Sequence, residues 1–209
     1  MARPAEPEKK ADLAREAIDV FARLGFDVPM SKLADELGVK RPTLLYHFPS
    51  RAHVVEAALF ELLVEQAKYV MSKVEAHEHP IDRLDAQIRA VHAFHHGKEQ
   101  RITLLSQAVV SNAAQMSNII DIGNKVFEAQ RQAAAERVRK GVEQGVVHPC
   151  DADALICLVR AVIDGLMVQR VMTGVALAPI HEFFWTNVLL PLKREPSSPK
   201  RPHRTEPAA

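Results

Sequence analysis

The chain has 209 residues, of which 47% are hydrophobic and 25% charged, and its formal net charge is +1. This composition is typical of a globular protein, and the weak charge excludes a DNA-coating surface spread over the whole chain. The longest apolar stretch, 154–168, is interrupted by two charges and the N-terminus lacks a signal-peptide core, so we expect a cytoplasmic protein with no membrane partner.

Three helices are predicted in the first fifty residues. Apolar side chains recur on one face of 9–24, and Gly25 ends this helix. Two short helices follow within 25–49, separated by Gly38, which suits the left-handed position that ends a helix. Val39 fills the turn, and Pro42 supplies a preset φ at the start of the second short helix.

The exposed side of that second short helix carries cations, a hydroxyl and an aromatic ring, while Leu44, Leu45 and Phe48 can face the protein. Such side chains suit phosphates and base edges of DNA. The exposed residues are Lys40, Arg41, Thr43, Tyr46 and His47. The helix pair alone also fits an ordinary helical hairpin.

The order of residues across this pair resembles the DNA-binding signature of the TetR family of bacterial repressors. The matching residues are Leu33, Ala34, Gly38, Val39, Thr43, Leu44, Tyr46, His47 and Phe48, within a resemblance that covers roughly 9–60. It implies DNA contacts by the five residues above, with Ser31, Lys32 and Arg51 on phosphates. The chain departs from the family pattern at Lys40 and Pro29, where hydroxyl residues are usual, so we expect an altered operator preference.

The remaining elements are also predicted to be helices, about nine in all, giving an all-α fold. Their ranges are 51–77 with Ser50 as cap, 81–96, about 100–113, 117 to 141 or 145, 151–172 and about 180–190. We expect a helix-turn-helix DNA-binding domain over 1–50 and a ligand-binding and dimerisation domain over 51–192. A basic, proline-rich tail over 193–209 is expected to be disordered.

The helix over 151–172 is apolar nearly all round, which favours burial on more than one side. The last helix is rich in aromatic residues, as interfaces are. We therefore predict a homodimer built from a four-helix bundle, as the resemblance also implies, with Phe183 and Trp185 at the interface. Arg160 and Asp164 are spaced to form an ion pair at this seam. The alternative is a monomer that buries both helices internally.

No pattern of catalytic residues is found, and we expect neither an enzyme nor a cofactor. His92, His95 and His96 have a spacing that could offer two imidazoles to a metal, yet no third ligand is placed by the sequence. We therefore predict no metal site. Cys150 and Cys157 are expected to be reduced.

The resemblance also implies a small-molecule pocket among the middle helices. Its candidate lining residues are His92, Phe94, Leu105, Gln107, Asn112 and Met116. The leading hypothesis is a dimeric repressor that binds a pseudo-palindromic operator and is released by a small molecule. The alternatives are an activator, and a ligand- or metal-sensing helical protein whose head docks a protein partner instead of DNA.

Overall fold

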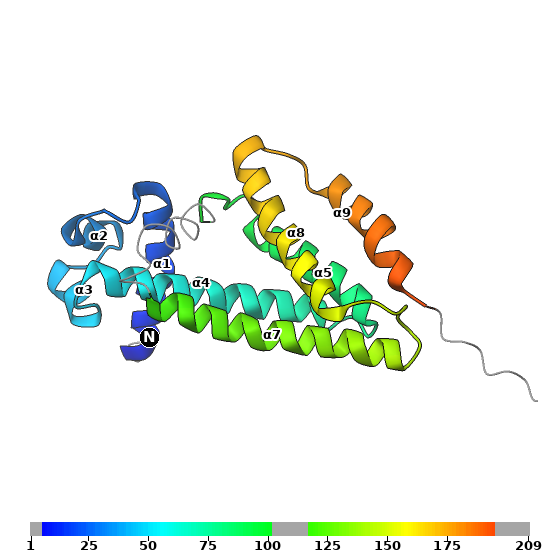
Figure 1. The fold of residues 1–209 in the computed structure, drawn as a ribbon. Coiled ribbons are helices and arrows are strands. Elements are labelled where there is room, and N and C mark those ends of the chain that lie inside the picture. Colours follow the sequence, from blue (N-terminus) through cyan, green and yellow to red (C-terminus); the bar gives the residue numbers. More distant parts are fainter. Residues whose placement is uncertain (1–5, 102–116, 195–209) are drawn as a thin grey trace, which may run out of the picture.

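Regular structure in the described part of the chain is helical, as predicted, apart from an isolated bridge between Val147 and Lys193. The structure is a computed structural model that describes residues 6–101 and 117–194, so most of the helix predicted over 100–113 lies outside it. The α-helices are α1 (Glu6–Leu24), α2 (Met30–Glu36), α3 (Arg41–His47), α4 (Arg51–Val74), α5 (Pro80–His95), α7 (Ser117–Glu143), α8 (Ala152–Thr173) and α9 (Ala178–Phe184) (Figure 1).

The first three helices and the start of α4 share one hydrophobic core, and we call α1, α2, α3 and residues 51–62 the head. Leu33 of α2 and both Leu44 and Phe48 at α3 are fully buried in this core. The core continues into α4 as far as Leu62, beyond residue 50, where the sequence predicts the domain boundary. Short helices of seven residues are not stable alone, so α2 and α3 depend on this packing.

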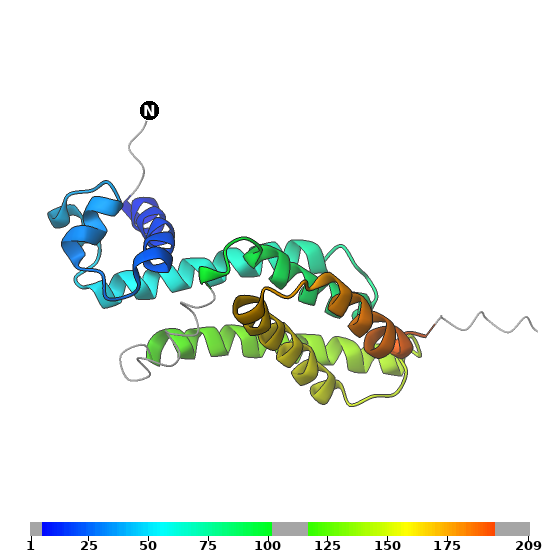
Figure 2. The ribbon, with the colours of Figure 1, turned by 90° about the horizontal axis from the view of Figure 1, so that it is seen from above.

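A second core forms among α5, α7, α8 and the C-terminal helices, with Ile81, Ile88 and Val138 almost fully buried. Figure 2 shows the head at one end of α4, with α8 and α9 alongside α5 toward the other end. Asp151 caps α8 by accepting from the Ala154 N–H at 3.0 Å, and Gly174 ends it at a φ of +69°. Both boundaries agree with the predicted helix to within a residue.

The last predicted helix is wound differently from the expectation. In place of one helix over about 180–190, α9 is followed by a π-helical segment, Trp185–Leu189, and a 3₁₀ turn, Leu190–Leu192. The π-helical segment comes just before Pro191 and the 3₁₀ turn contains it. Proline has no N–H to donate and its ring crowds the preceding turn of an α-helix, so regular α-helical winding does not continue to this end.

Local polar contacts differ from the sequence-based expectation at Ser50 and at Lys193. The Ser50 hydroxyl bonds to His53 Nδ1 at 2.8 Å and caps no backbone N–H of α4. Asp27, in the loop before α2, pairs with Arg51 at 3.2 Å. Lys193, the first residue of the predicted tail, pairs with Asp82 at 2.7 Å, so the described start of that tail is bonded to the body.

The turn between α2 and α3 generates a stability prediction. Gly38 has a φ of +63°, and a Cβ built there meets nothing within 4 Å, so substitution costs only backbone strain. Gly38→Ala should lower the free energy of unfolding by about 1–2 kcal/mol, measured by urea denaturation of the full chain. Gly38→Asn is the matched control and should lose less, because asparagine tolerates this conformation. Equal losses would show that the turn does not depend on the left-handed backbone.

Candidate DNA-binding face and ligand pocket

One side of α3 faces solvent, because the buried residues on its other side hold the helix in the core of the head. Leu44 and Phe48 are inaccessible, whereas the Tyr46 side chain is 69% exposed. Lys40 and Arg41, at the start of the helix, are exposed as well. The structure therefore places a phenol and two cations at the surface of a helix whose other side is locked in a core.

The other predicted DNA-contacting residues lie on this helix or close to it in the chain. Thr43 and His47 of α3 are half-buried, and the His47 ring packs edge-on against Tyr46 with centroids 5.1 Å apart. Ser31 and Lys32 are exposed at the start of α2. Arg51 is half-buried and pairs with Asp27, but Asp27 is fully exposed, and exposed ion pairs are weak enough for a phosphate to compete.

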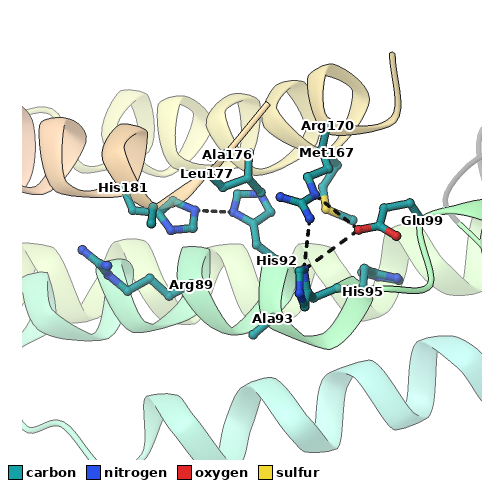
Figure 3. Close-up of a pocket in the computed structure, with 12 residues that line it drawn as sticks. Arg89, His92, Ala93, His95, Glu99, Met167, Arg170, Ala176, Leu177 and His181 are labelled. Atoms are coloured by element: carbon teal, nitrogen blue, oxygen red, sulfur yellow. Dashed lines mark hydrogen bonds and ion pairs between the residues drawn. The ribbon is translucent and has the colours of Figure 1, made fainter. Parts of the chain in front are cut away.

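A cavity of about 370 Å³ lies between α5, α8 and the start of α9 (Figure 3). Its walls combine apolar side chains with imidazole and charged groups. The lining residues are Arg89, His92, Ala93, His95, His96, Glu99, Met167, Arg170, Ala176, Leu177, Ala178 and His181.

Only one of the predicted ligand-binding residues within the described ranges, His92, lines this cavity. Phe94 is placed elsewhere: two positions further on, it packs against Tyr69 of α4 with ring centroids 5.7 Å apart. Helical geometry explains the difference, since residues two apart point to different sides of a helix. The other candidates, Leu105, Gln107, Asn112 and Met116, lie outside the described residues.

Three buried histidines form the polar wall of the cavity. His92 Nδ1 lies 2.7 Å from His181 Nε2, and the two rings are parallel with centroids 4.9 Å apart. His92 Nε2 is 3.0 Å from the Ile163 carbonyl oxygen. His95 Nε2 is 2.8 Å from Gln66 Oε1 on α4. The sequence drew attention to His92 and His95 as candidate metal ligands, but nothing in it links them to His181 or Gln66.

All three imidazoles are uncharged at neutral pH. Burial, followed by the charges of Arg101 and His92, lowers the pKa of His95 to about 4. Burial and the neighbouring His92 lower the pKa of His181 to about 4, and burial also lowers the pKa of His92. Each ring therefore has one N–H donor and one acceptor nitrogen.

Two arginines line the cavity, and carboxylates already neutralise both. Arg89 pairs with Asp85 at 2.7 Å and with Glu182 at 3.0 Å. Arg170 pairs with Glu99 at 3.2 Å and also donates to the Val175 carbonyl at 3.3 Å. The described residues contain no cluster of three metal-ligating side chains.

Two polar contacts connect the cavity region with the connector helix α4 and with the head. The bond from His95 to Gln66 reaches α4. Arg101, two residues after the cavity residue Glu99, makes a bidentate bond to Asp19 of α1, with both N···O distances 2.8 Å. No local sequence pattern indicates this pair, because its members are 82 positions apart.

A stripe of small and apolar residues follows the outer face of α8, and we call it the α8 stripe. Its members are spaced alternately by four and three and are all exposed: Ala154, Leu158, Ala161, Gly165, Val168 and Met172. Arg160 and Asp164 beside it form the predicted ion pair at 2.6 Å. Phe183 of α9 is 66% exposed, whereas Trp185 is half-buried with Lys193 Nζ 5.6 Å from its ring centroid.

Among the described residues, no helix is both long and apolar enough to cross a bilayer.

Comparison with known proteins gives one family match and many similar folds. Residues 13–58, which cover most of the head, match the model described as bacterial regulatory proteins, tetR family. No curated protein matches the sequence.

Three solved structures illustrate the similarity of fold. A TetR transcription regulator from Haloarcula marismortui has a TM-score of 0.75 at 17% identity, with 90% of this chain and 100% of that chain covered. The TetR family regulator PfmR from Thermus thermophilus gives 0.64 at 18%, covering 87% and 99%. AibR, solved with isovaleryl coenzyme A and operator DNA, gives 0.65 at 15%, covering 88% and 99%.

The match falls on the helices that hold the exposed face of α3, and the fold agrees over nearly the whole length of these neighbours. The family consists of regulators that act by binding DNA, not of enzymes. Over residues 13–58 the chain therefore matches the TetR family of bacterial regulatory proteins, and over most of its length it shares the fold of solved TetR regulators.

Proposed function

We propose that the protein is a homodimeric repressor that binds a pseudo-palindromic operator and is released by a small molecule held between α5, α8 and α9. The observation that carries the proposal is the placement of three features on one framework. An exposed α3 stands at one end of the molecule (Figure 1), and an uncovered apolar stripe lies on α8. The cavity lies between α5, α8 and α9, and its residue His95 is bonded to Gln66 of α4. AibR, which shares the fold, was solved with both isovaleryl coenzyme A and operator DNA.

In the proposed complex, α3 enters the major groove. Lys40, Arg41, Thr43, Tyr46 and His47 contact bases or nearby phosphates, and Ser31, Lys32 and Arg51 contact the backbone. The net charge of +1 means that affinity has to come from this local surface, repeated in two protomers. Two copies of α3 about 34 Å apart would read successive turns of one DNA face.

The dimer interface is proposed to consist of the α8 stripe and α9. The stripe leaves Leu158 and Val168 each 45% exposed and Met172 75% exposed. Its small members, such as Ala161 and Gly165, allow a partner helix to approach closely. Phe183 extends the apolar surface onto α9, while Arg160, Asp164 and the half-buried Trp185 lie at its margin.

These roles divide the chain into a DNA-binding domain and a ligand-binding and dimerisation domain. We assign DNA binding to 1–50 and ligand binding and dimerisation to 51–192, with α4 packed in both cores. The cavity is assigned to the effector because it is concave and mainly apolar with a few polar groups, as ligand sites are.

The DNA-binding proposal predicts the effect of two substitutions in α3. Arg41→Ala and Tyr46→Ala should each weaken binding to a site selected from random duplex DNA by at least tenfold, since each removes a base or phosphate contact. Binding is measured by fluorescence anisotropy at several salt concentrations. Arg41→Ala should also make the salt dependence shallower, by about one unit of slope for each phosphate that the guanidinium group neutralises.

Arg139→Ala is the matched control, because it removes an exposed cation from α7, far from the head. It should leave affinity unchanged while the circular dichroism of all variants stays constant. Unaltered binding by the two α3 variants would refute the site assignment. Selected sites without two-fold symmetry would refute the proposed mode of binding, and a flat salt dependence would favour a head that docks protein.

The dimer proposal predicts that a charge on the α8 stripe separates the protomers. Leu158→Asp should shift the protein from dimer to monomer in sedimentation equilibrium, because it places a carboxylate in a desolvated interface. Phe60→Asp is the control: Phe60 is also 45% exposed but lies on α4, outside the proposed interface. Dissociation by both variants, or by neither, would contradict the placement of the interface.

A further inference from the structure

The hydrogen bonds of the three buried histidines fix where their protons lie. A neutral imidazole has one N–H and one bare nitrogen, so a nitrogen that faces an acceptor must carry the proton. The Ile163 carbonyl oxygen only accepts, and it lies 3.0 Å from His92 Nε2. His92 therefore carries its proton on Nε2, and its Nδ1 is an acceptor.

The hydrogen bond between the two rings then fixes the position of the proton on His181. Because His92 Nδ1 is an acceptor, the hydrogen bond of 2.7 Å between the two rings requires His181 Nε2 to donate. The remaining nitrogen, His181 Nδ1, is then a bare acceptor, and the described residues supply no hydrogen-bond donor to it. One end of the cavity is thus lined by a ring that can accept a hydrogen bond but cannot give one.

His95 reaches the same state independently. Its Nε2 faces the Gln66 side-chain oxygen, so the proton lies on Nε2 and Nδ1 is an acceptor. This nitrogen is inaccessible to water and has no hydrogen-bond partner among the described residues, and His95 as a whole is 2% exposed. It therefore offers no acceptor to a molecule in the cavity, and His181 Nδ1 is left as the acceptor that faces it.

The charges around the cavity do not favour an anion. Its two guanidinium groups, on Arg89 and Arg170, are paired with the carboxylates of Asp85, Glu182 and Glu99. Three carboxylates against two cations leave no surplus positive charge to compensate a second anion. Apart from these ion pairs and the imidazole groups, the wall is apolar, with Met167 and Leu177 among its residues (Figure 3).

We propose that this cavity selects an uncharged effector with an apolar body and a hydrogen-bond donor, such as a hydroxyl, which His181 Nδ1 accepts. This inference rests on the proposed role of the cavity as the effector site.

Three probes of similar length test the selectivity: 1-octanol, its isomer heptyl methyl ether, and octanoate. The isomers have the same composition, but only the alcohol donates a hydrogen bond, while octanoate adds a negative charge. Isothermal titration of the full-length dimer should show 1-octanol binding about tenfold more tightly than either of the others, the effect expected of one buried hydrogen bond. Equal binding of the ether, tighter binding of octanoate, or no binding of any probe would overturn the proposal.

Two variants assign the effect to the named nitrogen. His181→Gln and His95→Gln each place an amide near the former Nε2 position, which keeps the bond to His92 or Gln66, but remove Nδ1. His181→Gln should reduce the preference for the alcohol over the ether at least threefold, whereas His95→Gln, the matched control, should not. An unchanged preference in His181→Gln would overturn the assignment to this ring.

The proton positions can be read directly. The ¹⁵N shifts of the labelled, ligand-free protein should show His92, His95 and His181 as neutral rings protonated on Nε2, and a proton on Nδ1 of His95 or His181 would overturn the inference. Binding of the ligand-free protein to selected DNA is measured separately. Loss of that binding refutes the proposed repressor, whereas failure of the probes alone refutes only the effector class.

Discussion

The arrangement of the molecule depends on one helix that packs in two cores. The first half of α4 contributes Val54 and Leu62 to the core of the head, and Val70 in its last part packs against the second core. Close-packed interiors resist independent movement of their parts. A displacement of α5 therefore has to pass along α4 to α3, because α3 has no core other than the one that α4 completes.

Two polar contacts make this mechanical connection more specific. Gln66 and His95 join α4 to α5 in a buried setting, and Arg101 and Asp19 join the end of the same region to α1. Arg101 is itself 9% exposed, and its bidentate geometry fixes orientation as well as distance. The head is thus bonded through both of its long helices to residues that lie in or next to the cavity.

The sequence predicted the structure correctly where a short local pattern determines it. Helical periodicity predicted α1 to α4, and the positive φ of Gly38 follows from its position at a helix end. It failed where the structure depends on residues far apart in the chain, such as His92 and His181, which are 89 positions apart. The wrong prediction of Ser50 as a cap has a local cause of another kind, since His53 competes for its hydroxyl.

Trp185 gives the protein a built-in optical probe. It is the single tryptophan of the chain, half-buried beneath the Lys193 ammonium group and two residues from the exposed ring of Phe183. Indole emission responds to a nearby cation and to the exclusion of water. Its emission should therefore report on the C-terminal helices alone, without any added label. The tyrosine of α3 can be used separately to follow changes at the opposite end of the molecule.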